Sequence, residues 1–184
     1  MRVLFGSDRV PGAAERLRPG GRIRGLEGTA MQLADLLNAR CVLLGMPPLS
    51  KEELIRSMVD RLAEAGLVES VAPVVRALLD RERVMSTGVG GGVALPHAQC
   101  TAVMDFAVAF ARPSEPVEFE ALDGEPVQVL FMVVGPGDRT GLMRILTRIS
   151  RLLYTGDLQK KALKVQTPEE FIRLVAAEEA RIKA

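Results

Sequence analysis

The feature that most constrains the fold is an almost uninterrupted apolar run at residues 127–134. A turn signal, Asp123-Gly124, precedes this run, and Gly135-Pro136-Gly137 ends it. A strand that is apolar on both sides belongs at the centre of a sheet with helices on both faces. The run is far shorter than the roughly twenty residues of a membrane-spanning helix, so we expect no direct membrane insertion.

Two further strands are expected from the pattern of apolar residues. Residues 41–44 form a compact apolar run before Pro47. At residues 104–110, large apolar side chains alternate with smaller or polar ones, which predicts a strand with one strongly buried face.

In much of the remaining sequence, apolar residues recur with the spacing of a helix. Ser50 and Glu53 have the spacing of a capping box, which predicts the start of a helix that ends near Gly66. Further helices are expected near residues 31–37, 71–79, 142–153, 157–162 and from Thr167 onward. Helices before, between and after the strands predict an α/β fold in a single domain, with the sheet sandwiched between helices.

Composition supports one folded domain with no general affinity for polyanions. The chain has 184 residues, 48% of them hydrophobic, and a formal net charge of +1. We therefore expect no nucleic acid partner. Residues 1–27 are rich in arginine and glycine and predict an extension that the fold does not need, with the domain at residues 28–184. The start lacks a secretory signal, so we expect a cytoplasmic protein in which Cys41 and Cys100 are reduced.

The segment from Arg81 to His97 combines many glycines with the only histidine of the chain. A Walker loop would end in Gly-Lys-Ser/Thr, and this segment contains no lysine. A dinucleotide fingerprint would lead into a helix, whereas this run leads into Val-Ala-Leu-Pro. Neither nucleotide motif is present, and we expect no cofactor.

The order of the motifs in this segment resembles a known active-site signature. Arg81-Glu82-Arg83 is followed by Ser86-Thr87-Gly88, a bend of small residues and Gly-Val-Ala-Leu-Pro-His97. This order resembles the type 2 enzyme IIA domains of the phosphotransferase system, the fructose, mannitol and nitrogen-regulatory family. The resemblance covers about residues 31–179 and implies a mixed β-sheet flanked by helices.

The resemblance also implies a function. His97 would accept a phosphoryl group from the histidine phosphocarrier protein and pass it to a cysteine of an enzyme IIB domain, or hold it as a signal for a regulatory protein partner. Arg81 matches the arginine of the family pattern. A neutral imidazole is a competent nucleophile, and a guanidinium offers a fork of donors to phosphate oxygens. The catalytic residues implied are therefore His97 and Arg81.

The sequence departs from the family at two positions near this signature. Many relatives have a second histidine where this chain reads Thr140-Gly141-Leu142-Met143-Arg144, and many have a basic residue where it has Gln99. Arg139 or Arg144 is a candidate to supply the positive charge. One histidine with Cys100 gives too few ligands for a closed zinc site, so no metal is expected.

Three functions remain open from the sequence. The first is a phosphoryl carrier for sugar transport. The second is a nitrogen-type regulatory protein whose phosphorylation controls partner binding without moving a sugar. The third is a degenerate relative that no longer takes a phosphoryl group. Incubation with an active phosphoryl donor separates the third from the first two.

Overall fold

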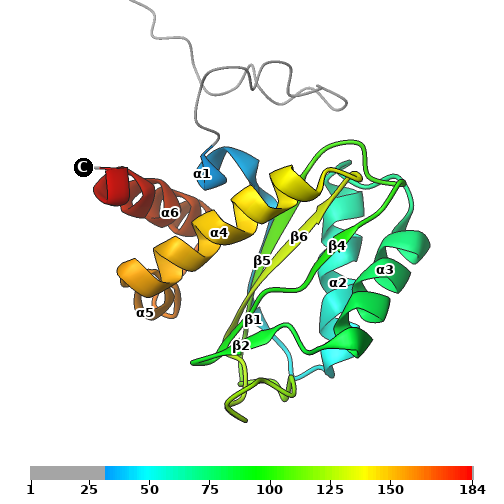
Figure 1. The fold of residues 1–184 in the computed structure, drawn as a ribbon. Coiled ribbons are helices and arrows are strands. Elements are labelled where there is room, and N and C mark those ends of the chain that lie inside the picture. Colours follow the sequence, from blue (N-terminus) through cyan, green and yellow to red (C-terminus); the bar gives the residue numbers. More distant parts are fainter. Residues whose placement is uncertain (1–31, 184) are drawn as a thin grey trace, which may run out of the picture.

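A computed structural model describes residues 32–183, so the expected extension at residues 1–27 lies outside the described part. Figure 1 shows the order of the elements along the chain. The strands are β1 (Leu37–Met46), β2 (Gly88–Gly90), β3 (Val93–Ala94), β4 (His97–Gln99), β5 (Ala107–Pro113) and β6 (Val129–Gly135). The helices are α1 (Leu33–Leu36), α2 (Lys51–Glu64), α3 (Val71–Val84), α4 (Arg139–Thr155), α5 (Leu158–Ala162) and α6 (Pro168–Lys183).

The sheet is mixed, as the family resemblance implied. Its strand order is β1-β5-β6-β3-β2, and β4 pairs with β6 beyond the end of β3. β1 runs parallel to β5, β5 runs antiparallel to β6, and both β3 and β4 run parallel to β6. Strands β2, β3 and β4 were not expected from the sequence, because they are two or three residues long and give no measurable periodicity.

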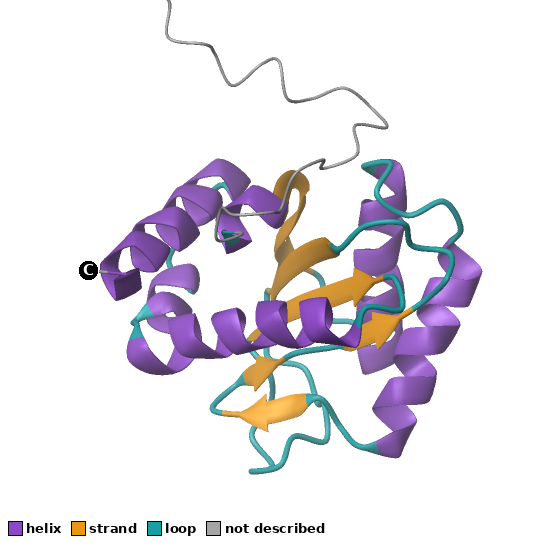
Figure 2. Cartoon of the chain, turned by 45° about the horizontal axis from the view of Figure 1, so that its top comes forward, coloured by secondary structure: helices purple, strands orange, loops and turns teal. Residues whose placement is uncertain are grey.

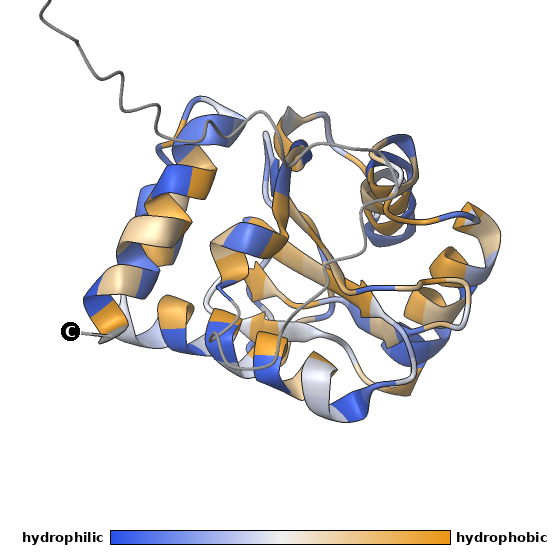
Figure 3. Cartoon of the chain, turned by 90° about the horizontal axis from the view of Figure 1, so that it is seen from above, coloured by the Kyte–Doolittle hydropathy of each residue, from blue (hydrophilic) through white to orange (hydrophobic). Residues whose placement is uncertain are grey.

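Helices cover both faces of the sheet. In Figure 1, α2 and α3 lie on one side of the strands, and α4, α5 and α6 lie on the other. Alternate residues of β6 belong to two different hydrophobic clusters, Leu130, Met132 and Val134 to one and Val129, Phe131 and Val133 to the other. The prediction of a central strand buried on both faces is confirmed. Figure 2 shows the sheet between the helices, and Figure 3 shows that its strands are largely hydrophobic.

The strand expected at residues 104–110 begins later than predicted, at Ala107. Met104 lies in the preceding loop and is 66% exposed. The expectation of one buried face is also wrong, since Ala107, Ala109 and Ala111 are as buried as Val108 and Phe110. The small residues face the cluster beneath α2 and α3, where short side chains allow the helices to approach the sheet closely.

Three helices begin with residues that suit the first turn of a helix, where backbone N–H groups have no partner within the helix. Ser50 and Glu53 form the predicted capping box, in which each side chain accepts a bond from the other residue's backbone N–H. Asp138 caps α4 by accepting a hydrogen bond from the Gly141 N–H at 3.0 Å. Pro168 occupies the first position of α6, where no N–H partner is required.

The start of α4 is fixed against the end of β6 by one aromatic ring. A Cβ atom on Gly135 would lie 2.2 Å from the Phe106 ring, and one on Gly141 would lie 2.5 Å from the same ring. Both positions therefore require glycine, because the ring fills the space a side chain would need. This contact sets the place of the α4 first turn beside the carboxyl end of β6.

Candidate functional site

The glycine-rich segment folds into the β2–β3 hairpin. Gly90, Gly91 and Gly92 all have positive φ angles, between 61° and 93°. Such angles are costly for residues with a Cβ atom, so the hairpin turn depends on glycine. Asp123 closes the turn by accepting a hydrogen bond from the Gly91 N–H at 2.7 Å. The strand after the hairpin is β4, and its first residue is the histidine.

His97 is the first residue of β4 and pairs with Val133 of the central strand. The Val133 N–H donates to the Pro96 carbonyl at 2.9 Å, which anchors the backbone just before the histidine. The side chain is half-buried. The imidazole is thus carried by a strand that is paired with the central strand, and its side chain is partly exposed.

One ring nitrogen of His97 is already engaged. Nδ1 lies 2.8 Å from the carbonyl oxygen of Leu95. A carbonyl oxygen only accepts hydrogen bonds, so in the neutral ring Nδ1 carries the proton and Nε2 keeps its lone pair. The geometry therefore leaves Nε2 as the ring nitrogen with a free lone pair.

The environment favours the neutral form of this ring. Burial lowers the pKa of His97, and the positive charge of Arg81 lowers it further. The hydrogen bond to Leu95 and the negative charge of Glu82 act in the opposite direction, but the net shift is downward. Near neutral pH most molecules therefore carry an uncharged imidazole, which is the form able to attack an electrophile.

Arg81 lies in the last turn of α3, close enough for its charge to act on His97. Its Nη1 donates to the carbonyl oxygen of Met85 at 2.9 Å, just past the end of the helix. The structure thus brings the two residues singled out in the sequence into one electrostatic environment. A cation beside a neutral nucleophile suits the binding of an anionic group.

Three residues behind the site were not identified from the sequence. Glu82 is buried and accepts hydrogen bonds from the backbone N–H and the hydroxyl of Thr87. Lys51, from the start of α2, forms an ion pair with the same carboxylate at 2.8 Å. Glu82 and Thr87 stand in the sequence motif without an assigned role, and only the folded arrangement shows that the Glu82 side chain is buried.

The positions where the chain departs from its relatives lie beside the end of β6. Gln99 is exposed, and its Nε2 is 3.5 Å from the Pro136 carbonyl, a weak contact at most. Arg139 and Arg144 are exposed on the first turns of α4. Cys100 is half-buried and free. Within residues 32–183 no three histidine, cysteine or acidic side chains are grouped to hold a metal ion.

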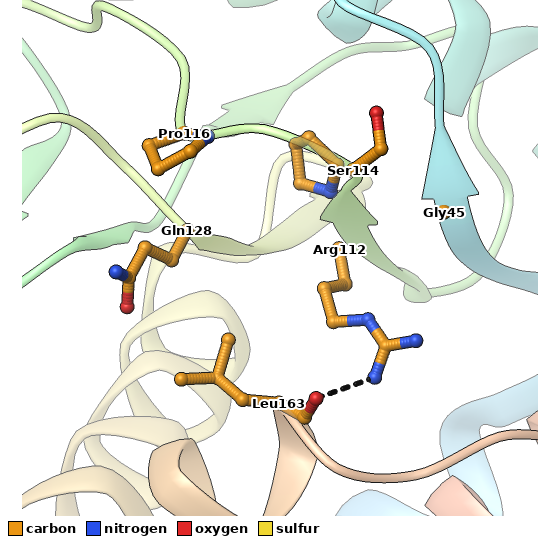
Figure 4. A pocket seen from close by; sticks show the side chains of 7 residues that line it. Gly45, Arg112, Ser114, Pro116, Gln128 and Leu163 are labelled. Carbon is orange, nitrogen blue, oxygen red and sulfur yellow. Dashed lines mark hydrogen bonds between the residues drawn. The ribbon is translucent and has the colours of Figure 1, made fainter.

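A separate hollow lies at the opposite end of the sheet, near the carboxyl ends of β1 and β5. Figure 4 shows Arg112 there, and Ser114 and Gln128 also line this hollow. The Nη1 of Arg112 donates to the carbonyl oxygens of Ala162, Leu163 and Val165 at 2.7–3.1 Å. These bonds satisfy backbone carbonyl groups at and just after the end of α5, so the guanidinium has a structural role. None of the site residues predicted from the sequence lines this hollow.

The candidate site consists of a half-buried imidazole and an arginine whose charge acts on it, on a mixed sheet between two helix layers. The family model described as the phosphoenolpyruvate-dependent sugar phosphotransferase system, EIIA 2, matches residues 35–178. The chain belongs to this family, whose members are phosphotransferase components. No helix among the described residues is long and apolar enough to cross a membrane.

Relatives of both the sugar-specific and the nitrogen-regulatory kind are similar to this chain. The fructose-specific EIIA component of Haloferax volcanii is 37% identical over 124 residues, which cover 67% of this chain and 80% of the relative. A nitrogen regulatory protein of Bradyrhizobium diazoefficiens is 33% identical over 71% of this chain and 86% of its own length. The chain spans only 23% of the Bacillus subtilis fructose-specific EIIABC component, to which it is 32% identical.

Solved structures give the same fold. The nitrogen regulatory protein IIA-Ntr of Neisseria meningitidis aligns with a TM-score of 0.68 and 32% identity over 77% of this chain and 97% of the other. A complex of enzyme IIA mannitol with phosphorylated enzyme IIB mannitol from Escherichia coli aligns with a TM-score of 0.66 and 24% identity, over 77% of this chain and 97% of the matched chain. The prediction of a type 2 enzyme IIA fold is confirmed.

The titration of His97 tests the electrostatic description of the site. Because this imidazole is the only one in the chain, its ring signals in an NMR titration are unambiguous. We expect a midpoint below the ordinary value of about 6.5. The Arg81→Ala variant should titrate at higher pH, since removal of the nearby cation makes protonation easier. An unchanged midpoint in that variant would place Arg81 too far away to act on the ring.

Proposed function

We propose that this chain is a phosphoryl carrier of the phosphoenolpyruvate-dependent phosphotransferase system that takes the group on Nε2 of His97. The observation that carries the proposal is the 2.8 Å contact between Nδ1 and the Leu95 carbonyl, which leaves Nε2 with its lone pair. The site fits the requirement of phosphoryl transfer, which depends more on positioning and charge than on covalent assistance.

The proposed reaction has two steps. In the first, the Nε2 lone pair attacks the phosphorus held by the histidine phosphocarrier protein, and the bond between phosphorus and the donor nitrogen breaks. In the second, a thiolate of an enzyme IIB partner attacks the same phosphorus and the bond to Nε2 breaks. The proton stays on Nδ1 throughout, hydrogen-bonded to the Leu95 carbonyl oxygen, and Arg81 stabilises the charge on the phosphoryl oxygens. Both partner classes imply a cytoplasmic location.

Exposed apolar side chains on segments that adjoin the site support docking of a protein partner. Val84 and Met85 follow Arg81 by a few residues, Met104 lies in the loop after β4, and Met143 lies near the start of α4. Methionine adapts its shape to different partners, which suits a carrier that must meet a donor and an acceptor in turn. Arg139 and Arg144 are the candidates for a second positive charge near the phosphoryl group.

The nitrogen-regulatory relatives favour a second candidate, in which the phosphorylated form controls a regulatory partner and transfers nothing to a transporter. The test is incubation with phosphoenolpyruvate, enzyme I and the histidine phosphocarrier protein, followed by addition of an enzyme IIB domain. Intact-mass spectrometry should show one phosphoryl group added and then lost to the IIB cysteine. A stable adduct that no IIB domain removes would favour regulation, and no adduct at all would favour a degenerate relative.

The role of Arg81 is tested by its replacement. We expect Arg81→Ala to slow phosphoryl acceptance by roughly tenfold or more, since a charge-assisted contact to phosphate contributes on the order of 1.5–3 kcal/mol. Arg83→Ala is the matched control, because Arg83 lies two residues away, is 70% exposed and pairs with Asp80 instead. Equal rates of phosphoryl acceptance for the two variants in rapid-quench measurements would mean that Arg81 does not assist the transfer.

A further inference from the structure

A buried ion pair lies directly behind the site. Nζ of Lys51 is 2.8 Å from a carboxylate oxygen of Glu82, with the side chains only 16% and 6% exposed. The same ammonium donates to the Phe119 carbonyl at 3.1 Å and lies 4.8 Å from the centre of the Phe119 ring. It also pairs with the exposed Glu120 at 3.0 Å. The cation is therefore held on several sides and has little freedom to leave Glu82.

The carboxylate of Glu82 is equally constrained. Its oxygens accept the Thr87 N–H at 3.0 and 3.1 Å and the Thr87 hydroxyl at 2.5 Å. Burial alone would raise the pKa of Glu82, but the hydrogen bonds from Lys51 and Thr87 and the Lys51 charge bring it below its usual value. Glu82 is thus ionised and has donors from α2 and from the loop between α3 and β2.

Stability alone does not account for such a pair. Well-packed apolar residues of similar volume commonly stabilise a fold as well as a buried ion pair does, because burial of two charges is costly. A fully satisfied polar network instead fixes one arrangement of the groups it joins. The group that Glu82 fixes is Thr87.

A continuous hydrogen-bonded path leads from Thr87 to the imidazole. The Thr87 carbonyl accepts the Leu95 N–H at 2.9 Å, and the Leu95 carbonyl accepts the Nδ1 proton of His97 at 2.8 Å. Each bond of this path has ordinary length, and each donor has one acceptor. The position of the Leu95 carbonyl therefore depends on where Thr87 is held.

We propose that Lys51 and Glu82 are positioning residues for His97, which fix Thr87 and, through the Leu95 carbonyl, hold the proton on Nδ1 and the lone pair on Nε2. The proposal rests on the proposed function only in taking Nε2 as the atom that receives the phosphoryl group. Without the Leu95 acceptor, the proton exchanges between the two ring nitrogens, and a ring with its lone pair on Nδ1 directs that lone pair away from the partner.

The test compares the tautomer of His97 in the full chain before any phosphoryl donor is added. The ¹⁵N shifts of the two ring nitrogens, measured at about pH 8 where the ring is neutral, report which nitrogen carries the proton. We expect the Nδ1–H form in the wild type and a mixture in Glu82→Gln and in Lys51→Met. The rate of phosphoryl acceptance should fall by about tenfold in both variants, as expected for loss of a hydrogen bond that orients a catalytic imidazole. Because both residues act through Thr87, the double variant should be little worse than either single variant.

Glu179→Gln is the matched control. Glu179 is also a buried carboxylate, which accepts the Leu33 and Ala34 N–H groups and pairs with Arg148 at 2.9 Å. Its network joins α1, α4 and α6 and has no bond to the path through Thr87. The control should lower the melting temperature and leave the His97 tautomer unchanged.

The outcomes separate this proposal from the proposed function. A folded Glu82→Gln variant with the wild-type tautomer and rate would overturn the positioning role. If the wild type takes no phosphoryl group, the carrier function fails, while the tautomer comparison still decides the role of Glu82. If Glu82→Gln does not fold, the His97 tautomer is compared between the wild type and two other variants, Lys51→Met and Thr87→Val. Thr87→Val is isosteric and removes the hydroxyl that donates to Glu82. Wild-type tautomers in both would equally overturn the proposal.

Discussion

His97→Ala is expected to accept no phosphoryl group while it keeps the fold of the wild type. The chain contains a single imidazole, so a phosphoramidate has no other histidine on which to form. The loss should be complete, because the nucleophile itself is removed rather than an interaction that assists it. Intact-mass spectrometry after incubation with an active cognate donor measures the result, and circular dichroism measures the fold.

Two controls make the outcome specific. Gln99→Ala changes an exposed neighbour on the same strand and should leave the adduct unchanged. The wild-type adduct should be labile in acid and comparatively stable in base, the reverse of a phosphoserine on Ser86. The Ser86 hydroxyl already donates to the Phe119 carbonyl at 2.7 Å, so its side chain is occupied. A phosphorylated His97→Ala chain would place the reactive group elsewhere and refute the carrier mechanism.

The sequence predicts those parts of the fold that local chemistry determines. The capping box of Ser50 and Glu53 requires only residues of one turn, and the apolar run of β6 reflects burial along one strand. Strands β2, β3 and β4 could not be predicted, because they exist only by pairing with each other and with β6. Met104 was wrongly assigned to the strand because the apolar alternation begins before β5, in an exposed loop.

The candidate site could be predicted only in part, for the same reason. His97 and Arg81 stand out in the sequence as a motif, although their chemical roles remain proposals. The inward orientation of Glu82 depends on Lys51, which comes from another helix, and on the turn that brings Thr87 back toward α3. The tautomer of His97 depends on the course of the backbone at Leu95. The spacing of residues along the sequence does not predict contacts of this kind.

The largest expected loss of stability comes from Phe171→Ala in α6. Phe171 is fully buried and stacks on Phe110 of β5, with ring centroids 3.8 Å apart, while Phe131 of β6 meets Phe110 edge to face at 4.9 Å. These three rings join α6 to the centre of the sheet. Truncation of a buried phenylalanine leaves a cavity and costs about 3–5 kcal/mol.

For a domain of this size that loss corresponds to a fall in melting temperature on the order of 10 °C, which differential scanning calorimetry measures directly. Tyr154→Ala is the control, since this aromatic side chain lies on α4 with 75% of its surface exposed and should change stability by no more than about 0.5 kcal/mol. Because none of the hydrogen bonds that join Lys51 to His97 involves a residue of α6, the folded Phe171→Ala protein should accept a phosphoryl group at the wild-type rate well below its melting temperature. A fall no larger than that of Tyr154→Ala would mean that α6 contributes little to the core, and a reduced rate in the folded variant would mean that the α6 side of the sheet also positions the imidazole.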